Sequence, residues 1–258
     1  MKRILALPIC AFIIWASAAV AQIGLPWPGP GGVNGAVIPI STPVSLGSSI
    51  SAAAIRSSWT LTTIAAIPAG SLAVVCTHAT FAAAQTVTSV SDGTNSYTAA
   101  VTNAFDASTQ LVSACWIKEN AAAVGSSATI TVNFSANTLA QPSIINAGYV
   151  VGTLSSGSLD KTNSGLQAPG TAYASGTTGT LTQANEIAFG FVDMYNANAS
   201  ITEGAGFTAI NTIAQGSGSF AQSRFAYQIV AATTALNYQP TASLATFGKA
   251  LIMTIKGN

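Results

Sequence analysis

The chain has 258 residues, of which 6% are charged and 49% are hydrophobic. Because soluble domains are usually about 25% charged, the surface of this protein must consist mainly of hydroxyl, amide and backbone groups. After Lys2 and Arg3 the basic residues stand singly along the chain, so there is no basic stripe to neutralise a phosphate backbone. This pattern argues against nucleic-acid binding.

Residues 1–21 have the pattern of a secretory signal peptide. A basic start is followed by an apolar run from Ile4 to Val20, and Ala19-Val20-Ala21 matches a small-x-small cleavage site. A retained membrane anchor would need about 20 apolar residues, and this run is at the short edge of that range. No later apolar run approaches that length. We therefore expect a secreted, extracellular or cell-surface protein without a membrane span after cleavage, with the periplasm as the alternative compartment.

Residues 22–43 are interpreted as a Pro/Gly-rich arm or linker. Their prolines and glycines disfavour helices and strand ladders and favour an extended, solvated backbone. Trp27 stands between two prolines, and a free tether has no need of so large an aromatic side chain. Two interpretations are open: Trp27 docks onto its own domain or a neighbouring subunit, or it is a lone surface aromatic.

Residues 44–258 are interpreted as one β domain. Short runs rich in β-branched residues are separated by Gly, Ser, Asn and Asp, which is typical of strands and turns, and residues 152–179 are expected to be loop-rich. One open sheet of so many strands would leave an apolar face in water, so we predict an all-β, two-sheet antiparallel β-sandwich that is jelly-roll-like. The expected strands are Ser58–Ile64, Leu72–Thr77, Thr86–Val90, Ser96–Val101, Leu111–Ile117, Ala128–Phe134, Ile144–Val151, Glu186–Asp193, Phe207–Ile213, Phe220–Val230 and Phe247–Lys256.

A hairpin pattern covers residues 87–98. A strand that ends in Val90-Ser91-Asp92 turns through Gly93 and returns with Tyr97-Thr98. This pattern resembles hairpins of secreted bacterial or phage-associated jelly-roll-like β-sandwich modules, and the likeness extends over roughly residues 70–152. The resemblance implies a building or attachment domain, and it brings no catalytic residues with it.

Cys76 and Cys115 are the two cysteines that remain after cleavage, because Cys10 lies in the signal peptide. Each belongs to an apolar, strand-like run. In an oxidising compartment they can form a disulfide, whereas a buried free thiol is an equally ordinary role. The sequence leaves both open. A bond would stabilise the fold by about 4 kcal/mol in the loop-entropy model.

No pattern in the chain predicts a catalytic or metal site. The acidic residues show no catalytic spacing for a glycosidase pair, and His78 with Cys76 is too small a set for zinc. No Gly-x-Ser-x-Gly elbow stands in a strand-to-helix context. Calcium is the cofactor least easily dismissed, since Asp92 and Asn95 offer oxygen ligands, but a plain turn is favoured. We expect no enzyme and no cofactor. The acidic residues are Asp92, Asp106, Glu119, Asp160, Glu186, Asp193 and Glu203.

The aromatic residues allow two interpretations of their role. They can form a flat platform for stacking sugars, or they can fill the core of a sandwich. Trp116, between Cys115 and Ile117 on a strand, is expected in the core, and Tyr195 in a polar loop is the better surface candidate. The others considered are Trp59, Tyr97, Tyr149, Tyr173 and Tyr238.

These observations favour an exported, non-enzymatic structural or attachment protein of a cell surface, filament or virion. It would act by self-association or adhesion, with itself or other surface proteins as partners. The alternative is a carbohydrate-binding β-sandwich module whose partner is a polysaccharide.

Overall fold

The computed structural model describes residues 39–51, 54–195, 199–214 and 221–258. These residues belong to one compact unit that spans Val37–Asn258. The expected signal peptide and most of the expected arm, including Trp27, lie outside the described residues. The last arm residues are part of the compact unit, because Ile40 is buried and the Ser41 amide donates to the Val151 carbonyl at 3.0 Å.

The described residues form strands and loops without a helix, as the sequence predicts. Accordingly, none of these segments is a helix of the length and apolarity needed to cross a bilayer. The strands are β1 (Val44–Ile50), β2 (Ser58–Thr62), β3 (Leu72–Thr80), β4 (Val87–Ser91), β5 (Thr98–Asp106), β6 (Leu111–Lys118), β7 (Thr129–Phe134), β8 (Ile144–Val150), β9 (Leu159–Ala172), β10 (Glu186–Met194), β11 (Ile201–Thr202), β12 (Thr208–Ala214), β13 (Gln222–Val230) and β14 (Thr241–Lys256).

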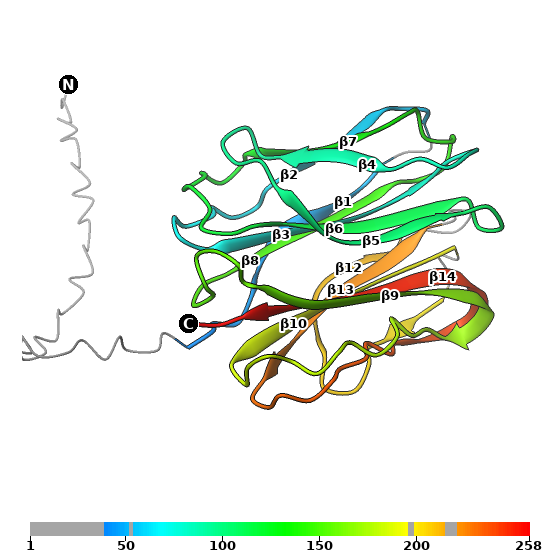
Figure 1. Ribbon diagram of the computed structural model, residues 1–258. Helices are drawn as coiled ribbons and strands as arrows, with labels where there is room; N and C mark the ends of the chain where they lie inside the picture. The colour runs from blue at the N-terminus through cyan, green and yellow to red at the C-terminus, as the bar shows by residue number, and fades with distance from the viewer. Residues whose placement is uncertain (1–38, 52–53, 196–198, 215–220) are drawn as a thin grey trace, which may run out of the picture. The chain divides into compact units, whose positions relative to one another are not determined.

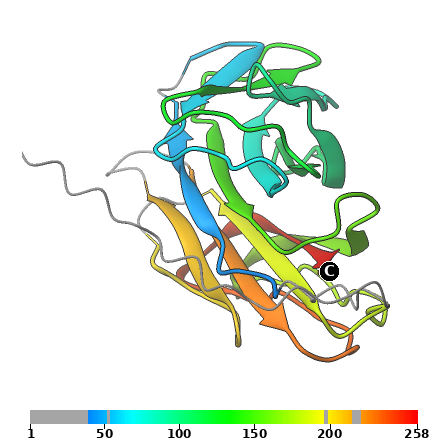
Figure 2. The ribbon, with the colours of Figure 1, turned by 90° about the vertical axis from the view of Figure 1, so that its left-hand side faces the viewer.

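The described residues form three antiparallel sheets, whereas the sequence predicts two. The first has the strand order β2-β7-β4, and the second has the order β1-β8-β3-β6-β5. The third has the order β11-β14-β10-β13-β12, with β9 also paired to β14. In Figure 1 these layers follow one another from top to bottom, and Figure 2 shows the third sheet, yellow to red, below the sheets of the N-terminal half.

The second sheet is the middle layer and is buried on both faces. Every residue of β3 is buried. Its odd-numbered residues Ala73 and Val75 pack in a cluster with Trp59 of the first sheet, whereas Leu72 and Val74 pack in a second cluster, which includes Phe189 of the third sheet. The prediction of two sheets was wrong because the middle sheet has two apolar faces, and each face needs a sheet to cover it.

The third sheet has a second apolar face of its own, and loops cover it. Tyr238 is fully buried there in a cluster with Val192 and Ile252. Its ring packs on Gly190 of β10, where a Cβ atom would lie 2.6 Å from the ring. A side chain at position 190 would therefore force the Tyr238 ring or the strand to shift.

Three strands of the described residues lie where the sequence predicts none, and the shortest of them is the two-residue β11. β9 runs through the stretch that was expected to be loop-rich, and β1 precedes the first expected strand. β9 is held by backbone pairing with β14, and most of its side chains are exposed or half-buried. Its sequence therefore lacks the apolar signal by which a strand is recognised.

Candidate functional site

A network of ionisable side chains lies between the second and third sheets. His78 Nδ1 is 2.6 Å from Asp193 Oδ2, and Ser113 Oγ donates to Asp193 Oδ1 at 3.0 Å. Strand register builds the network, because His78 is the cross-strand partner of Ser113 and Asp193 is the partner of Lys249. Each of these four side chains is at most 1% exposed.

Lys249 completes this interlayer network. Its Nζ donates to the carbonyl oxygens of Ala104 at 2.6 Å and Leu111 at 2.8 Å, so the side chain of β14 reaches β5 and β6 of the middle sheet. Burial lowers the pKa of the Lys249 ammonium, and the charges of Asp193 and Asp106 oppose this effect. The lysine thus joins two layers by charge-assisted hydrogen bonds.

The network contains Ser, His and Asp in an order that does not activate the serine. In a nucleophilic triad the histidine stands between serine and aspartate and accepts the serine proton through Nε2. Here Asp193 stands between Ser113 and His78, and His78 Nε2 has no hydrogen-bond partner. We interpret the network as a structural link between the sheets.

A disulfide joins Cys76 of β3 to Cys115 of β6, with an S–S distance of 2.04 Å. The two cysteines are direct cross-strand partners. The structure therefore has the bonded form of the two that the sequence left open. It also rules out a Cys-His nucleophile at Cys76, because the sulfur has no free thiolate.

The turn after β4 satisfies its own polar groups. Asp92 Oδ1 accepts from the amides of Thr94 at 2.9 Å and Asn95 at 2.6 Å, while Oδ2 accepts from Asn95 Nδ2 and Tyr97 Oη. Burial, together with the neighbouring Asp92 charge, raises the pKa of Tyr97. Both Asp92 oxygens are thus occupied by donors of the turn, which favours the plain turn over a calcium site at Asp92 and Asn95. No group of three or more His, Cys, Asp or Glu in the described ranges is arranged to hold a metal ion.

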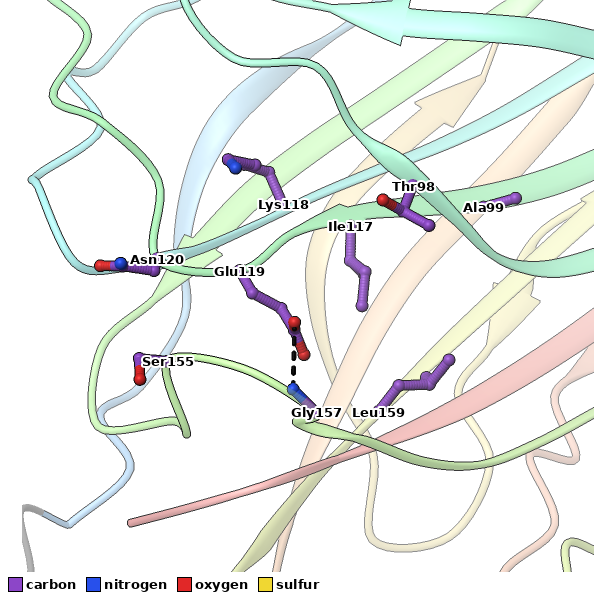
Figure 3. Close-up of a pocket in the computed structure, with 9 residues that line it drawn as sticks. All are labelled: Thr98, Ala99, Ile117, Lys118, Glu119, Asn120, Ser155, Gly157 and Leu159. Atoms are coloured by element: carbon purple, nitrogen blue, oxygen red, sulfur yellow. Dashed lines mark hydrogen bonds between the residues drawn. The ribbon is translucent and has the colours of Figure 1, made fainter.

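A cavity of about 450 Å³ lies beside the end of β6. Figure 3 shows Glu119 directed across it toward Gly157, whereas Lys118 points away. Glu119 accepts from the Ser158 amide at 2.5 Å, the Ser158 hydroxyl at 2.6 Å and the Gly157 amide at 3.2 Å. Burial alone would raise the pKa of Glu119, but these hydrogen bonds outweigh it and the pKa lies below its usual value.

Glu119 therefore anchors the loop before β9. It is the one carboxylate among the residues that line this cavity, so the pair required by a glycosidase is missing from it. The lining residues are Thr98, Ala99, Ile117, Lys118, Glu119, Asn120, Ser155, Gly157 and Leu159.

A smaller polar pocket, about 190 Å³, surrounds Arg56 and Trp59. The Arg56 guanidinium lies 4.8 Å from the Trp59 ring centroid. Trp59 Nε1 and Ser143 Oγ are buried without hydrogen-bond partners. Arg224, by contrast, pairs with Glu203 at 3.3 Å, whereas the ion pairs of the described residues do not include Arg56. The pocket offers donors for an acidic or hydroxyl-rich ligand. Its lining also includes Ser49, Ser51, Thr60 and Ile145.

Every aromatic residue in the described ranges is buried or half-buried. Trp116 is 9% exposed and packs in the cluster between the first and second sheets, as expected. Tyr195 is half-buried and lines a pocket of about 190 Å³ with Ser108, Thr109, Gln110 and Phe247. The described part of the chain therefore lacks an exposed aromatic platform for sugars.

Comparison with protein-family models, with curated proteins and with solved structures finds no match to this chain.

Proposed function

We propose that this protein is an exported, non-enzymatic structural or attachment component of a cell surface, filament or virion. The observation that carries the proposal is that the side chains most able to do chemistry are engaged in structural hydrogen bonds within the fold. His78, Asp193 and Lys249 join two sheets at no more than 1% exposure, and Glu119 anchors a loop. What remains outside is a neutral surface rich in hydroxyl and amide groups, suited to contact rather than to chemistry.

The strand order supports this proposal. The chain passes repeatedly between the first two sheets. β1, β3 and β8 belong to the second sheet, and the strands next to them in the chain, β2, β4 and β7, belong to the first. We infer a jelly-roll-like connection of β1–β8, an architecture found in capsid and lectin domains. The pattern of residues 1–21 supports export, and a disulfide is compatible with an oxidising compartment.

Self-association through β9 is the proposed mechanism. β9 is an edge strand of 14 residues that pairs with β14 on one side. Edge strands present unpaired backbone groups to which a further strand can add. Leu166 lies on β9 and is 45% exposed, and Leu244 on β14 has the same exposure. These two leucines provide a matched pair for a test.

Size-exclusion chromatography with light scattering tests the mechanism. The purified protein is expected to elute as an oligomer or filament, and Leu166→Lys is expected to shift it toward the monomer because a charge at a strand edge opposes pairing. The control, Leu244→Lys, introduces the same charge and should leave the assembly unchanged. A monomer at every concentration, or an equal effect of both variants, contradicts the mechanism.

A carbohydrate-binding module is the second candidate, and the Arg56 pocket favours it. A guanidinium that forms no ion pair with the described residues and lies beside serine and threonine hydroxyls fits an acidic polysaccharide. Retention on immobilised alginate should be lost in Arg56→Met and kept in Lys118→Met, which removes one positive charge elsewhere. Equal loss in both variants would indicate unspecific charge attraction and would reject the pocket as a sugar site.

A further inference from the structure

Glu186, the first residue of β10, is buried, and the ion pairs of the described residues do not include it. Its side chain is 0% exposed, and neither Oε1 nor Oε2 has a hydrogen bond. By strand alternation it lies on the outer face of the third sheet, the face of Ala188 and Val192. A carboxylate removed from water without compensation is costly. The site therefore needs something that neutralises it.

The neighbour of Glu186 is a second carboxylate. Asp160 of β9 interacts with Glu186, and its side chain is 4% exposed. Burial, with the nearby Asp160 charge adding to it, raises the pKa of Glu186 to about 7. Asp160 already accepts from the Thr182 amide and hydroxyl, each at 2.8 Å. When both are ionised, two groups that can only accept hydrogen bonds face each other, so either a shared proton or a cation must lie between them.

Further oxygen atoms border this pair. Thr182 Oγ1 contacts Asp160, and the Thr254 hydroxyl of β14 interacts with Glu186. Lys161 Nζ lies 3.5 Å from Asp160 Oδ1, but its side chain is 30% exposed and has room to move into solvent. Oxygen donors with excess negative charge match the preference of hard cations, above all Ca²⁺.

We propose that Glu186 and Asp160, with the hydroxyls of Thr182 and Thr254, bind one calcium ion. The site joins β9, β10 and β14 to the loop that carries Thr182, so the ion would tie the edge strand to the sheet. Two carboxylates place it in the weak class of extracellular calcium modules, with Kd about 10⁻⁴–10⁻³ M. The inference does not depend on the proposed function.

Calorimetric titration of the chelator-treated protein with CaCl2 at pH 7.5 tests the site. We expect saturable binding of one ion and, about tenfold above Kd, a Tm higher by about 3–6 °C. Glu186→Gln should abolish both responses. Asp106→Asn, which removes a carboxylate from a turn outside the cluster, should keep both, and Lys161→Met should strengthen binding because it removes a competing positive charge.

The response to calcium, rather than the stability of each variant, is decisive, because Glu186→Gln also removes a buried charge. If CaCl2 produces neither heat nor a Tm shift in the unaltered protein, the calcium site is overturned and the pair is neutralised by a shared proton. Equal calcium responses in the unaltered protein and in Glu186→Gln would overturn it too, since binding would lie elsewhere.

Discussion

Replacing Asp193 with alanine tests whether the interlayer network is structural. The substitution leaves His78 Nδ1 and the Ser113 hydroxyl without their acceptor in a region that is at most 1% exposed. It also removes the negative charge that contributes most to stabilising the charged form of the buried Lys249 on the neighbouring strand. Breaking a buried ion pair by removing one partner costs about 3–5 kcal/mol. Such a loss is a large part of the about 5–15 kcal/mol that stabilises a typical domain.

Urea denaturation at pH 7, followed by tryptophan fluorescence, measures this loss as a change in midpoint at constant m-value. Asp106→Asn is the control, because it removes only the smaller of the two charges that act on Lys249, and an asparagine retains the turn hydrogen bonds. Its cost should stay below about 1 kcal/mol. A loss below about 1 kcal/mol for Asp193→Ala would refute the view that the network holds the two sheets together.

Three further outcomes are expected. Replacing Cys76 and Cys115 together by alanine should lower the free energy of unfolding by about 4 kcal/mol, since the bond closes a loop with a sequence separation of 39; denaturation at matched redox state checks this, and an unchanged midpoint would contradict it. Gly190→Ala should cost about 1–3 kcal/mol through its clash with the Tyr238 ring, measurable as a lower Tm, and an unchanged Tm would show that the ring moves aside freely. In calcium-free buffer, the contribution of Glu186 to the free energy of unfolding should be greatest at low pH. It should decline as pH rises from the usual pKa of 4.5 through the raised pKa of about 7. Thermal melts of Glu186→Gln should lack this decline, and an identical decline in the variant would assign it to other groups.

Much of the strand content could be predicted from the sequence, because local alternation is visible in it. The expected strand Ala128–Phe134 corresponds to β7, and Ile130, Val132 and Phe134 are all buried on one face as the alternation indicates. β9 was not predicted because its side chains show no periodic apolar pattern. It pairs with β14 through backbone groups, which every residue possesses.

The candidate sites were harder to predict because their members are far apart in sequence. His78 drew attention through Cys76, yet its partner Asp193 lies 115 residues away. One usable signal was present: Asp193 and Lys249 each interrupt an apolar strand, and a charge within a buried strand must find a partner. Which partner it finds depends on strand register between two sheets, and that register is not encoded locally.

Composition and periodicity were thus sufficient to predict an all-β chain, because the alternation of apolar and polar residues along a strand shows which of its faces avoids water. The number of layers and the pairing of Asp193 with His78, and of Glu186 with Asp160, were decided by tertiary structure. These features arise when strands distant in the chain stack, and the energy of a buried charge depends on the groups that stacking brings beside it.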